Sequence, residues 1–349
     1  MKKNLVIVGY GGMGQWHEEF AQKSDVVNLL GVYDIDEKKN NIARGKGIFV
    51  YQTFEDILND PRVDLITCAT PNDAHHDIVI KSLEAGKNVI SEKPVTMSSE
   101  LLRDMIDAAK KSNKIFTVHQ NRRWDEDFLS FKRAYESGAL GEVFNVESRV
   151  QGSHGIPGDW RAKKEFGGGM MLDWGVHLID QVLQMIPEKI STIYARMDHI
   201  TNAEVDDGFK LEIIFESGKR AFIEVGTRAF VSLPRWYMQG ENGTAILENW
   251  RVEDGNMVCC EDWDEKEVVP VKTAAGLTKT MAPRDSATIS ENRLPSCPSD
   301  VHDFYRNVCK AIDGEEEQLI THEQMMRVMK VMEYAFKSDS CGQVIGFDE

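Results

Sequence analysis

The stretch Asn4-Leu-Val-Ile-Val-Gly9-Tyr-Gly11-Gly-Met-Gly14-Gln-Trp16 joins a short apolar run to three glycines spaced Gly-x-Gly-x-x-Gly. A strand, a glycine turn and a helix start in this order form the pyrophosphate-binding turn of a dinucleotide-binding βαβ unit. The first glycine permits the tight turn, the second lets the backbone approach a phosphate, and the third allows close helix packing. The residues predicted to hold the dinucleotide here are Gly9, Gly11, Gly12, Met13 and Gly14. A glycine-rich turn without a ligand is the alternative.

Strands and helices alternate over the rest of the first 122 residues. Apolar runs predict strands at Asn28–Tyr33, Leu65–Ala69, Asn88–Ser91 and Ile115–His119. The segments between them predict helices at Trp16–Ser24, Asp56–Leu58, His75–Ala85 and Ser99–Asn113. Strands that alternate with helices form a parallel sheet that is covered on both faces. Residues 1–122 are therefore predicted to be a Rossmann domain with a doubly wound parallel sheet.

A different pattern follows residue 122, in which strand-like runs succeed one another. They lie at Val143–Val150, Ile190–Asp198, Gly208–Phe215, Lys219–Gly226 and Arg235–Gly240, with hairpin turns at Glu216–Lys219 and Glu241–Thr244. Helices predicted at Glu126–Ser137 and Met171–Met185 would cover one face of an antiparallel sheet, so residues 123–349 are predicted to be an α+β domain. The tail predicts helices at Val301–Ile312 and Thr321–Phe336, which are candidates to pack back on the first domain. Residues 268–298 are predicted to be a long loop or an arm.

Composition excludes several classes of protein. The formal net charge of -16 repels the phosphates of nucleic acids. No apolar run approaches the roughly 18 residues that a membrane span needs. The six cysteines show neither a CxxC pair nor the spacing of metal ligands: Cys68, Cys259, Cys260, Cys297, Cys309 and Cys341. We therefore expect a soluble, cytoplasmic protein with reduced thiols that binds no metal, no nucleic acid and no membrane.

Asp34 ends the second predicted strand and lies 20 residues after Gly14. A carboxylate at this position suits a hydrogen bond to a ribose 2′-hydroxyl and repels a 2′-phosphate. No arginine follows immediately, since residues 35–37 are Ile, Asp and Glu. NAD is therefore favoured over NADP. Two alternatives stay open, because Asp34 could instead cap a helix and because Lys38 and Lys39 could meet a phosphate.

The tetrapeptide Ser91-Glu92-Lys93-Pro94 follows a predicted strand. Lys93 is thus placed at the carboxyl edge of the sheet, where open α/β folds bind their ligands. An amine at that edge can donate to a substrate oxygen or relay its proton. A solvated surface charge is the alternative for this lysine.

The segment Gly167-Gly-Gly-Met-Met-Leu-Asp173-Trp-Gly-Val-His177 combines three glycines with an acid and a base at i and i+4. On a helix, that spacing puts Asp173 and His177 on the same face. His177 can take a hydroxyl proton, and Asp173 can orient either the imidazole or the substrate hydroxyl. The glycines are predicted to let the chain pass close to a ligand. A structural Asp-His pair is the alternative, and a metal site would need further ligands.

Together these three motifs resemble the Gfo/Idh/MocA family of oxidoreductases, and the order of the two domains agrees over almost the whole chain. The resemblance implies that Lys93, Asp173 and His177 form the catalytic set. His177 is then the base, Lys93 the proton partner or polariser of the reacting oxygen, and a nicotinamide the hydride acceptor.

The same resemblance implies further contacts around the cofactor and the substrate. The cofactor-binding residues that it implies are Thr70, Pro71, Asn72, His75, Glu92, Lys93 and Asn121. The substrate-binding residues that it implies, besides Asp173 and His177, are Arg122, Arg123, Trp160 and Arg161. Taken singly, each arginine could be a solvated rim residue and the tryptophan a core residue.

The expected reaction is a reversible NAD-dependent hydride transfer between nicotinamide and a secondary hydroxyl or ketone of a sugar, a glycoside or an inositol. Oxidation at carbon 3 of a glycoside is a variant of it. A redox-neutral, NAD-dependent glycosidase or lyase is the second class, with Tyr237 or His154 as a further base, and a sensor without catalysis is the third. A homodimer, tetramer or hexamer is expected to form through the open face of the second sheet. The residues do not select one ring.

Overall fold

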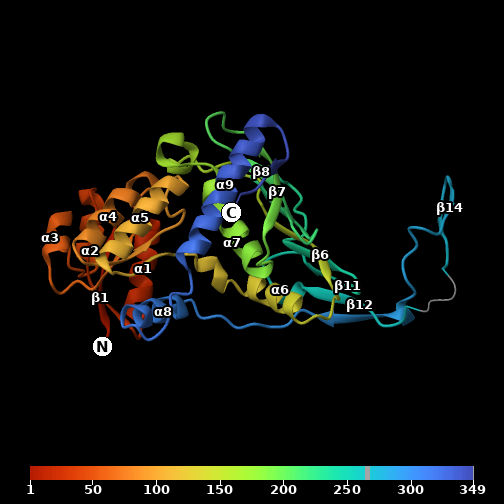
Figure 1. The fold of residues 1–349 in the computed structure, drawn as a ribbon, viewed down its shortest axis with the longest axis horizontal. Helices are drawn as coiled ribbons and strands as arrows, with labels where there is room; N and C mark the ends of the chain where they lie inside the picture. Colours follow the sequence, from red (N-terminus) through yellow and green to blue (C-terminus); the bar gives the residue numbers. More distant parts are fainter. Residues whose placement is uncertain (264–267, 349) are drawn as a thin grey trace.

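The computed structural model describes residues 1–263 and 268–348, which build two sheets with helices packed on them (Figure 1). The first sheet has five parallel strands in the order β2-β1-β3-β4-β5. Its strands are β1 (Lys3–Val8), β2 (Val27–Tyr33), β3 (Leu65–Cys68), β4 (Asn88–Ser91) and β5 (Phe116–Val118). The helices around it are α1 (Gly12–Lys23), α2 (Glu37–Gly45), α3 (Phe54–Asn59), α4 (His75–Glu84) and α5 (Ser99–Ser112). The prediction of a doubly wound parallel sheet is confirmed.

The strand order reverses at β1, because β2 lies on one side of it and β3 on the other. In open α/β sheets, ligands bind outside the carboxyl ends of the strands at this reversal. Every residue of β3 and β4 is buried, which explains why neither strand alternates between apolar and exposed polar residues. Because β3 and β4 run parallel, the polar residues that follow them lie at the same edge of the sheet.

The second sheet has nine strands in the order β15-β12-β11-β10-β6-β9-β8-β7-β16. Five strands lie where runs of apolar residues predict them: β6 (Val143–Gln151), β7 (Ile190–Asp198), β8 (Gly208–Phe215), β9 (Arg220–Gly226) and β10 (Trp236–Gly240). The others are β11 (Gly243–Leu247), β12 (Asn256–Cys260), β15 (Ile289–Arg293) and β16 (Ile345–Gly346). The expectation of a purely antiparallel sheet is wrong at one pairing, because β6 and β9 run parallel. Hairpin connections force neighbours in sequence to be antiparallel, whereas these two strands meet only after a long excursion of the chain.

Residues 268–298, predicted to be a loop or an arm, contain β15 and a separate two-stranded hairpin. The hairpin pairs β13 (Val271–Thr273) with β14 (Gly276–Thr278) and stands apart from both sheets in Figure 1. In contrast, β15 forms the edge of the nine-stranded sheet through its pairing with β12. The prediction of an arm therefore fits only the first part of this stretch.

One face of the nine-stranded sheet is covered by α6 (Glu126–Glu136), α7 (Val176–Met185) and α9 (His322–Cys341) (Figure 1). The helix predicted over Met171–Met185 is divided, because residues 171–175 form a π-helical turn ahead of α7. The helix α8 (His302–Ile312) lies beside the first domain, where the hydroxyl of Tyr305 contacts Nδ1 of His17. The tail therefore returns to the first domain.

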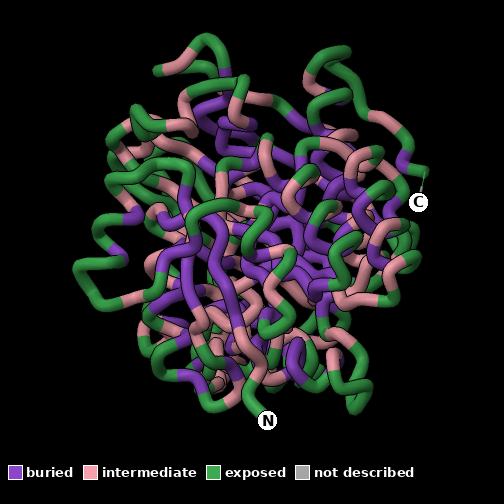
Figure 2. The backbone as a smooth tube through the Cα atoms, turned by 90° about the vertical axis from the view of Figure 1, so that its left-hand side faces the viewer, coloured by how far each residue is buried: buried purple, intermediate pink, exposed green. Residues whose placement is uncertain are grey.

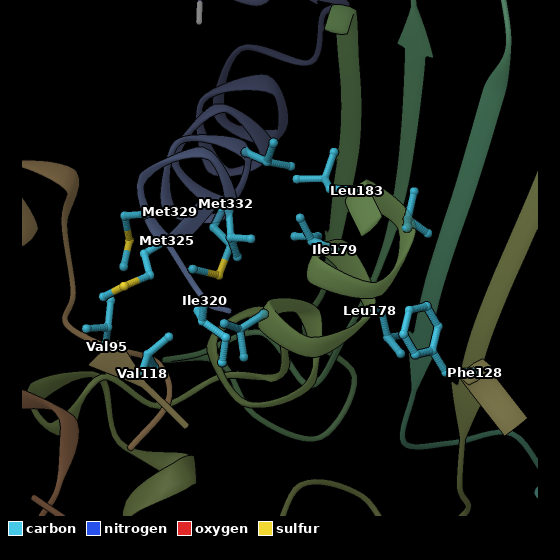
Figure 3. Close-up of a cluster of buried hydrophobic side chains, with 14 of the residues drawn as sticks. Val95, Val118, Phe128, Leu178, Ile179, Leu183, Ile320, Met325, Met329 and Met332 are labelled. Carbon is cyan, nitrogen blue, oxygen red and sulfur yellow. The ribbon is translucent and has the colours of Figure 1, made fainter. Parts of the chain in front are cut away.

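Helix α9 also joins the two domains through a shared apolar core (Figure 3). Met325, Met329 and Met332 are buried on one side of this helix. They line the same small cavity as Val95 and Val118, which belong to the first domain. The flexible thioether side chain suits such an irregular junction between elements. Figure 2 shows the buried backbone passing through the middle of the molecule, with exposed loops around it.

No helix among residues 1–263 and 268–348 is long and apolar enough to cross a membrane. None of the six cysteines, all of which lie in these ranges, forms a disulfide.

The glycine turn gives a first testable prediction. A Cβ at Gly14 would lie 2.1 Å from the carbonyl oxygen of Gly9, so the Gly14→Ala variant must push α1 away from the turn. Overpacking of this kind costs about 1–3 kcal/mol, and we expect a lower free energy of unfolding in urea. Gly12→Ala is the matched control, because a Cβ at Gly12 has no other atom within 4 Å. Equal stability of the two variants would contradict the packing described here.

Candidate active site

An ion pair joins the two domains at the carboxyl end of β4. The Nζ of Lys93 donates to Oδ1 of Asp173 at 2.8 Å and to the backbone carbonyl of Asp173 at 2.7 Å. The other carboxylate oxygen accepts from Nε of Arg161 at 2.9 Å. Burial by itself raises the pKa of Asp173, but the positive charges of Lys93 and Arg161 outweigh it and hold the pKa below its usual value. The carboxylate is thus ionised, with one cation on each oxygen.

His177 lies one turn further along and is almost fully buried. Burial and the nearby charges of Lys93 and Arg122 hold the pKa of His177 well below its ordinary value of 6.5. Among the residues that the structure describes, Nδ1 of His177 has no hydrogen-bond partner. A neutral imidazole with an unused nitrogen can accept a proton. His177 therefore has the properties of a general base.

Of the two roles that the sequence left open for Asp173, orientation of the His177 imidazole is not what the structure shows. Both oxygens of Asp173 are occupied by Lys93 and Arg161, and no hydrogen bond to His177 is formed within the described chain. The π-helical turn over Met171–Gly175 widens the backbone between the two residues, so the regular i, i+4 geometry does not apply. Asp173 orients Lys93 instead of the imidazole.

The glycines at 167–169 make room for the protein's own atoms, and the expectation that they let the chain pass close to a ligand stays a prediction. A Cβ at Gly168 would lie 2.3 Å from the carbonyl oxygen of Arg161. A Cβ at Gly169 would lie 2.2 Å from Oδ1 of Asp206, and its φ of +106° also favours glycine. The run therefore packs the start of the catalytic segment against two other loops.

A cavity of about 180 Å³ opens beside Asp173. Its walls include Gln151, Trp174 and Thr227. Gln151 ends β6 and pairs in register with Gly226 at the end of β9, so the parallel pairing brings two carboxyl strand ends to the same place. Amide, hydroxyl and carboxylate groups around one aromatic ring suit a small polar ring with an apolar face.

An aromatic cluster borders this cavity. The guanidinium carbon of Arg122 lies 4.2 Å from the centre of the Trp174 ring and 5.7 Å from that of Trp250. The two tryptophan rings lie 6.0 Å apart, and Trp250 is 46% exposed. Arg122 thus sits near the site, as predicted. Trp250 had no signal in the sequence, because nothing in its local pattern links residue 250 to residues 122 and 174.

Arg123 and Trp160 are placed differently from Arg122. Arg123 forms a bidentate pair with Asp180 at 2.8 and 2.6 Å and holds the segment 121–124 against α7. Both donors face a buried carboxylate, so the predicted substrate contact of Arg123 is replaced by a structural one. Trp160 packs its ring against the guanidinium of Arg161, with 4.5 Å from Cζ to the ring centre. It therefore supports Arg161, which itself reaches Asp173.

The comparisons with known proteins agree with this geometry. Residues 3–120 match the oxidoreductase family with an NAD-binding Rossmann fold, and residues 128–246 match the GFO/IDH/MocA C-terminal domain. A crystal structure of an NAD-binding protein from Listeria innocua has a TM-score of 0.96 and 44% identity, with 99% of each chain covered.

This chain belongs to the Gfo/Idh/MocA family of oxidoreductases.

Two relatives of this oxidoreductase carry inositol dehydrogenase names. The scyllo-inositol 2-dehydrogenase (NADP(+)) IolW of Bacillus subtilis (strain 168) is 27% identical over 338 residues, which cover 95% of this chain and 92% of that protein. The myo-inositol 2-dehydrogenase of Thermotoga maritima is 26% identical over 255 residues, which cover 70% of this chain and 75% of that protein. The expected family and the expected class of dehydrogenases are confirmed.

The predicted dinucleotide turn of this Gfo/Idh/MocA oxidoreductase is tied to Asp34. Oδ2 of Asp34 accepts from the backbone N–H of Tyr10 at 2.7 Å, and Oδ1 accepts from the N–H of Asp36 at 2.8 Å. The helix-capping role that was the alternative for Asp34 belongs to Asp36, which caps α2. Lys39 lies 3.4 Å from Asp34 and close to Gly11. A carboxylate can accept more than two hydrogen bonds, so Asp34 retains capacity for a ribose hydroxyl.

In the loop after β3, some predicted cofactor residues form hydrogen bonds with other parts of the protein, and others remain accessible. Nδ2 of Asn72 donates to the carbonyl of Gly167 at 2.9 Å, and both residues are buried. The ring nitrogens of His75 lie 2.9 Å from the carbonyl oxygen of Thr70 and 3.0 Å from that of Pro94. These contacts fix the loop beside Lys93–Pro94. The predicted cofactor residues that remain at least partly accessible are Thr70, Pro71 and Asn121, together with Gly11, Gly12, Met13 and Lys93.

Glu92 was predicted to bind the cofactor, but its carboxylate is occupied by the protein. Oε1 lies 2.9 Å from Nε2 of His17 and 2.8 Å from Nδ1 of His119, and Oε2 accepts from the backbone N–H of Lys93 at 3.1 Å. Burial opposes ionisation of Glu92, yet His119 and His17 hold its pKa well below the ordinary value. The cluster therefore anchors Lys93 from behind. Sequence reasoning missed it because the three residues share no spacing.

The cluster of His17, Glu92 and His119 has side chains of the kind that bind metal ions, although the sequence predicted no metal site. Three potential ligand atoms lie within 4.8 Å of one another here. Hydrogen bonds to Glu92 and Tyr305 occupy most of their polar atoms, whereas Nε2 of His119 has no partner among the described residues. The absence of a metal stays a prediction.

The protonation state of His177 is directly testable. Because burial and the cations Lys93 and Arg122 lower its pKa, the ring should stay neutral as the pH falls through 6.5. In a pH titration of ¹⁵N-labelled histidines by NMR, we expect the signal that is lost in His177→Asn to remain in its neutral position down to pH 6. A midpoint near 6.5 would contradict the site as described.

The role of Glu92 is tested by Glu92→Gln. This variant removes the charge and turns an amide N–H₂ toward two histidine donors, so we expect a clearly lower melting temperature. Affinity for NADH, measured by fluorescence titration, should stay within a few-fold. Glu84→Gln, an exposed change on α4, is the control. A tenfold loss of NADH affinity at unchanged stability would show that Glu92 contacts the cofactor.

Proposed function

We propose that this protein is an NAD-dependent dehydrogenase that transfers a hydride between nicotinamide and a secondary hydroxyl or ketone of a sugar, a glycoside or an inositol. The observation that carries the proposal is the Lys93–Asp173 ion pair, set beside a neutral His177 and a cavity of about 180 Å³. Asp173 lines this cavity and pairs with Lys93, and His177 follows one turn later on the same segment. An ammonium, a carboxylate and a neutral imidazole form a set that can manage the proton of a carbinol.

The proposed division of labour follows from the charges. Bound nicotinamide would supply the hydride acceptor, and the protein supplies orientation and proton handling. The Nζ of Lys93 donates a hydrogen bond to the reacting oxygen and stabilises the negative charge that develops there. Asp173 holds that ammonium in place through its carboxylate and its backbone carbonyl. A ring nitrogen of His177 accepts the hydroxyl proton during oxidation and returns it during reduction.

NAD is the proposed cofactor, on two grounds. The Asp34 carboxylate at the end of β2 would repel a 2′-phosphate. The relative from Listeria innocua is named an NAD-binding protein. Two observations favour NADP instead. Lys39 lies beside Asp34, and the name of the Bacillus relative includes NADP(+). The carboxylate is buried and fixed by the N–H of Tyr10 in the glycine turn, whereas the side chain of Lys39 is 41% exposed, so we favour NAD.

A polyol or sugar ring is the proposed substrate. Gln151, Thr227 and Asp173 can read ring hydroxyls by hydrogen bonds, and Trp174 offers an apolar surface to the ring's C–H face. The inositol dehydrogenase names of two relatives support this class. Oxidation at carbon 3 of a glycoside fits the same groups. A substrate of that kind would extend past the cavity toward the exposed ring of Trp250.

We also propose a cytoplasmic, homo-oligomeric enzyme. Six unpaired cysteines suit a reducing compartment. The face of the second sheet away from the helices carries half-buried apolar side chains, such as Ile214 and Phe222, among charged ones. A second copy of the chain is the proposed occupant of that face.

The direct test of the function is NADH formation across a panel of inositols, free sugars and glycosides, with NAD and NADP in parallel. We expect NADH to accumulate with at least one polyol or glycoside and a higher kcat/KM with NAD. No turnover with any member, in protein that still binds NAD, would contradict the dehydrogenase and favour the redox-neutral class. A higher kcat/KM with NADP would overturn the cofactor assignment.

Lys93→Met tests the assigned chemistry. Removal of the amine should lower kcat by about 10²–10⁴-fold, which is the range of a general acid or base. NADH affinity should change by no more than a few-fold, since the amine is expected to act on the substrate oxygen. Lys110→Met, an exposed change on α5, is the control. Near-native kcat in Lys93→Met would remove Lys93 from the catalytic set.

A further inference from the structure

Asp206 is a buried carboxylate that meets the start of the catalytic segment. Its Oδ2 accepts from the backbone N–H of Met171 at 2.7 Å, and its backbone carbonyl accepts from the N–H of Met170 at 2.9 Å. Met171 is the first residue of the π-helical turn that carries Asp173. The first N–H groups of a helical segment have no partner within it and must find acceptors elsewhere. Asp206 supplies two of these acceptors from another part of the chain.

The backbone around Gly169 is shaped to receive Asp206. A Cβ at Gly169 would lie 2.2 Å from Oδ1 of Asp206, so a larger residue would displace this carboxylate. The carbonyl of Gly169 accepts from the N–H of Asp173 at 3.0 Å, and its own N–H donates to the carbonyl of Arg161 at 2.9 Å. Asp206 is therefore adjacent to the residue that links the backbones of Asp173 and Arg161, whose side chains pair with each other.

No lysine or arginine pairs with Asp206 within the part of the chain that the structure describes. Burial raises the pKa of Asp206 to about 6, while the N–H of Met171 opposes the rise. A buried carboxylate without a cation is costly, because only backbone N–H groups compensate its lost hydration. We therefore look for a role that offsets this cost. The carboxylate binds the start of the turn that carries Asp173.

The neighbouring Asp207 is also a buried carboxylate that binds backbone N–H groups, but it stabilises a different segment. Its carboxylate accepts from the N–H of Ile200 at 3.0 Å, from Oγ1 of Thr201 at 2.7 Å and from the N–H of Asn202 at 3.2 Å. These contacts close the loop between β7 and β8 and involve no residue of the catalytic segment. Asp207 is thus a matched control for a buried carboxylate that binds backbone N–H groups.

We propose that Asp206 is a positioning residue for the reaction, because it fixes the start of the turn over Met171–Gly175 so that Asp173 meets Lys93. This inference rests on the proposed dehydrogenase function. Asp206 is not itself a cavity wall and forms no hydrogen bond with Lys93 within the described residues. It acts through the backbone N–H groups of Met170, which lines the cavity, and of Met171.

The kinetic test compares Asp206→Ala, Asp206→Asn and Asp207→Ala on the intact enzyme. A misplacement of about 1 Å in a catalytic group can cost up to 10²-fold in rate, so we expect kcat of Asp206→Ala to fall at least tenfold. NADH affinity should remain within twofold. Asp206→Asn keeps a carbonyl oxygen for Met171 and should restore kcat to within about threefold of the native value. Asp207→Ala should lower the melting temperature with little change in kcat.

Equal kcat in Asp206→Ala and Asp207→Ala would overturn the positioning role and leave Asp206 as a stability residue. If Asp206→Ala does not fold, an Asp206→Asn enzyme with less than a tenth of native kcat would overturn the role of the hydrogen bond.

Hydrogen exchange separates this inference from the proposed function, because it needs no turnover. The amides of residues 170–173 should lose protection in Asp206→Ala and keep it in Asp207→Ala. Unchanged protection in Asp206→Ala would overturn the inference even in an active enzyme. If Asp206→Ala loses this protection but the native protein turns over no polyol, Asp206 does hold the turn over Met171–Gly175. Only the proposed dehydrogenase function would then be contradicted.

Discussion

The Lys93–Asp173 ion pair is the constraint on which the rest of the site depends. It joins the end of β4 in the first domain to the turn before α7 in the second, 80 residues apart in sequence. Two partly buried charges gain little net stability from such a pair, because the loss of hydration offsets most of their attraction. The pair instead fixes the position of the Lys93 amine relative to Asp173, which lines the cavity, and the proposed chemistry depends on that position.

Each partner of the ion pair is supported from outside the cavity. On the side of Lys93, Glu92 holds the backbone N–H and is itself held by His17 and His119. On the side of Asp173, Arg161 occupies the second carboxylate oxygen. Helix α9 packs across both domains and keeps their relative positions (Figure 3). The rigidity of these supports sets the geometry that catalysis requires.

Local patterns in the sequence predicted the parts of the fold that local physics determines. The glycine turn at residues 9–14, the alternation of the first sheet and the positions of Lys93, Asp173 and His177 all follow from short stretches. The parallel pairing of β6 with β9, the cluster around Glu92 and the ring of Trp250 could not be predicted in this way. They depend on contacts between residues that lie far apart in the chain, and no regular spacing in the sequence indicates such contacts. The contacts of the glycines at 167–169 with Asn72 and Asp206 could not be predicted for the same reason.

The central claim is that a carbon-bound hydrogen of the substrate passes to nicotinamide at this site. The most direct measurement uses a polyol deuterated at its carbinol carbon, incubated with the protein and NAD, followed by mass spectrometry of the reduced nucleotide. The account predicts NADH that carries one deuterium from the substrate, formed at least about 10²-fold more slowly with Lys93→Met. NADH that forms without deuterium, or deuterium transfer at a near-native rate in Lys93→Met, would contradict it.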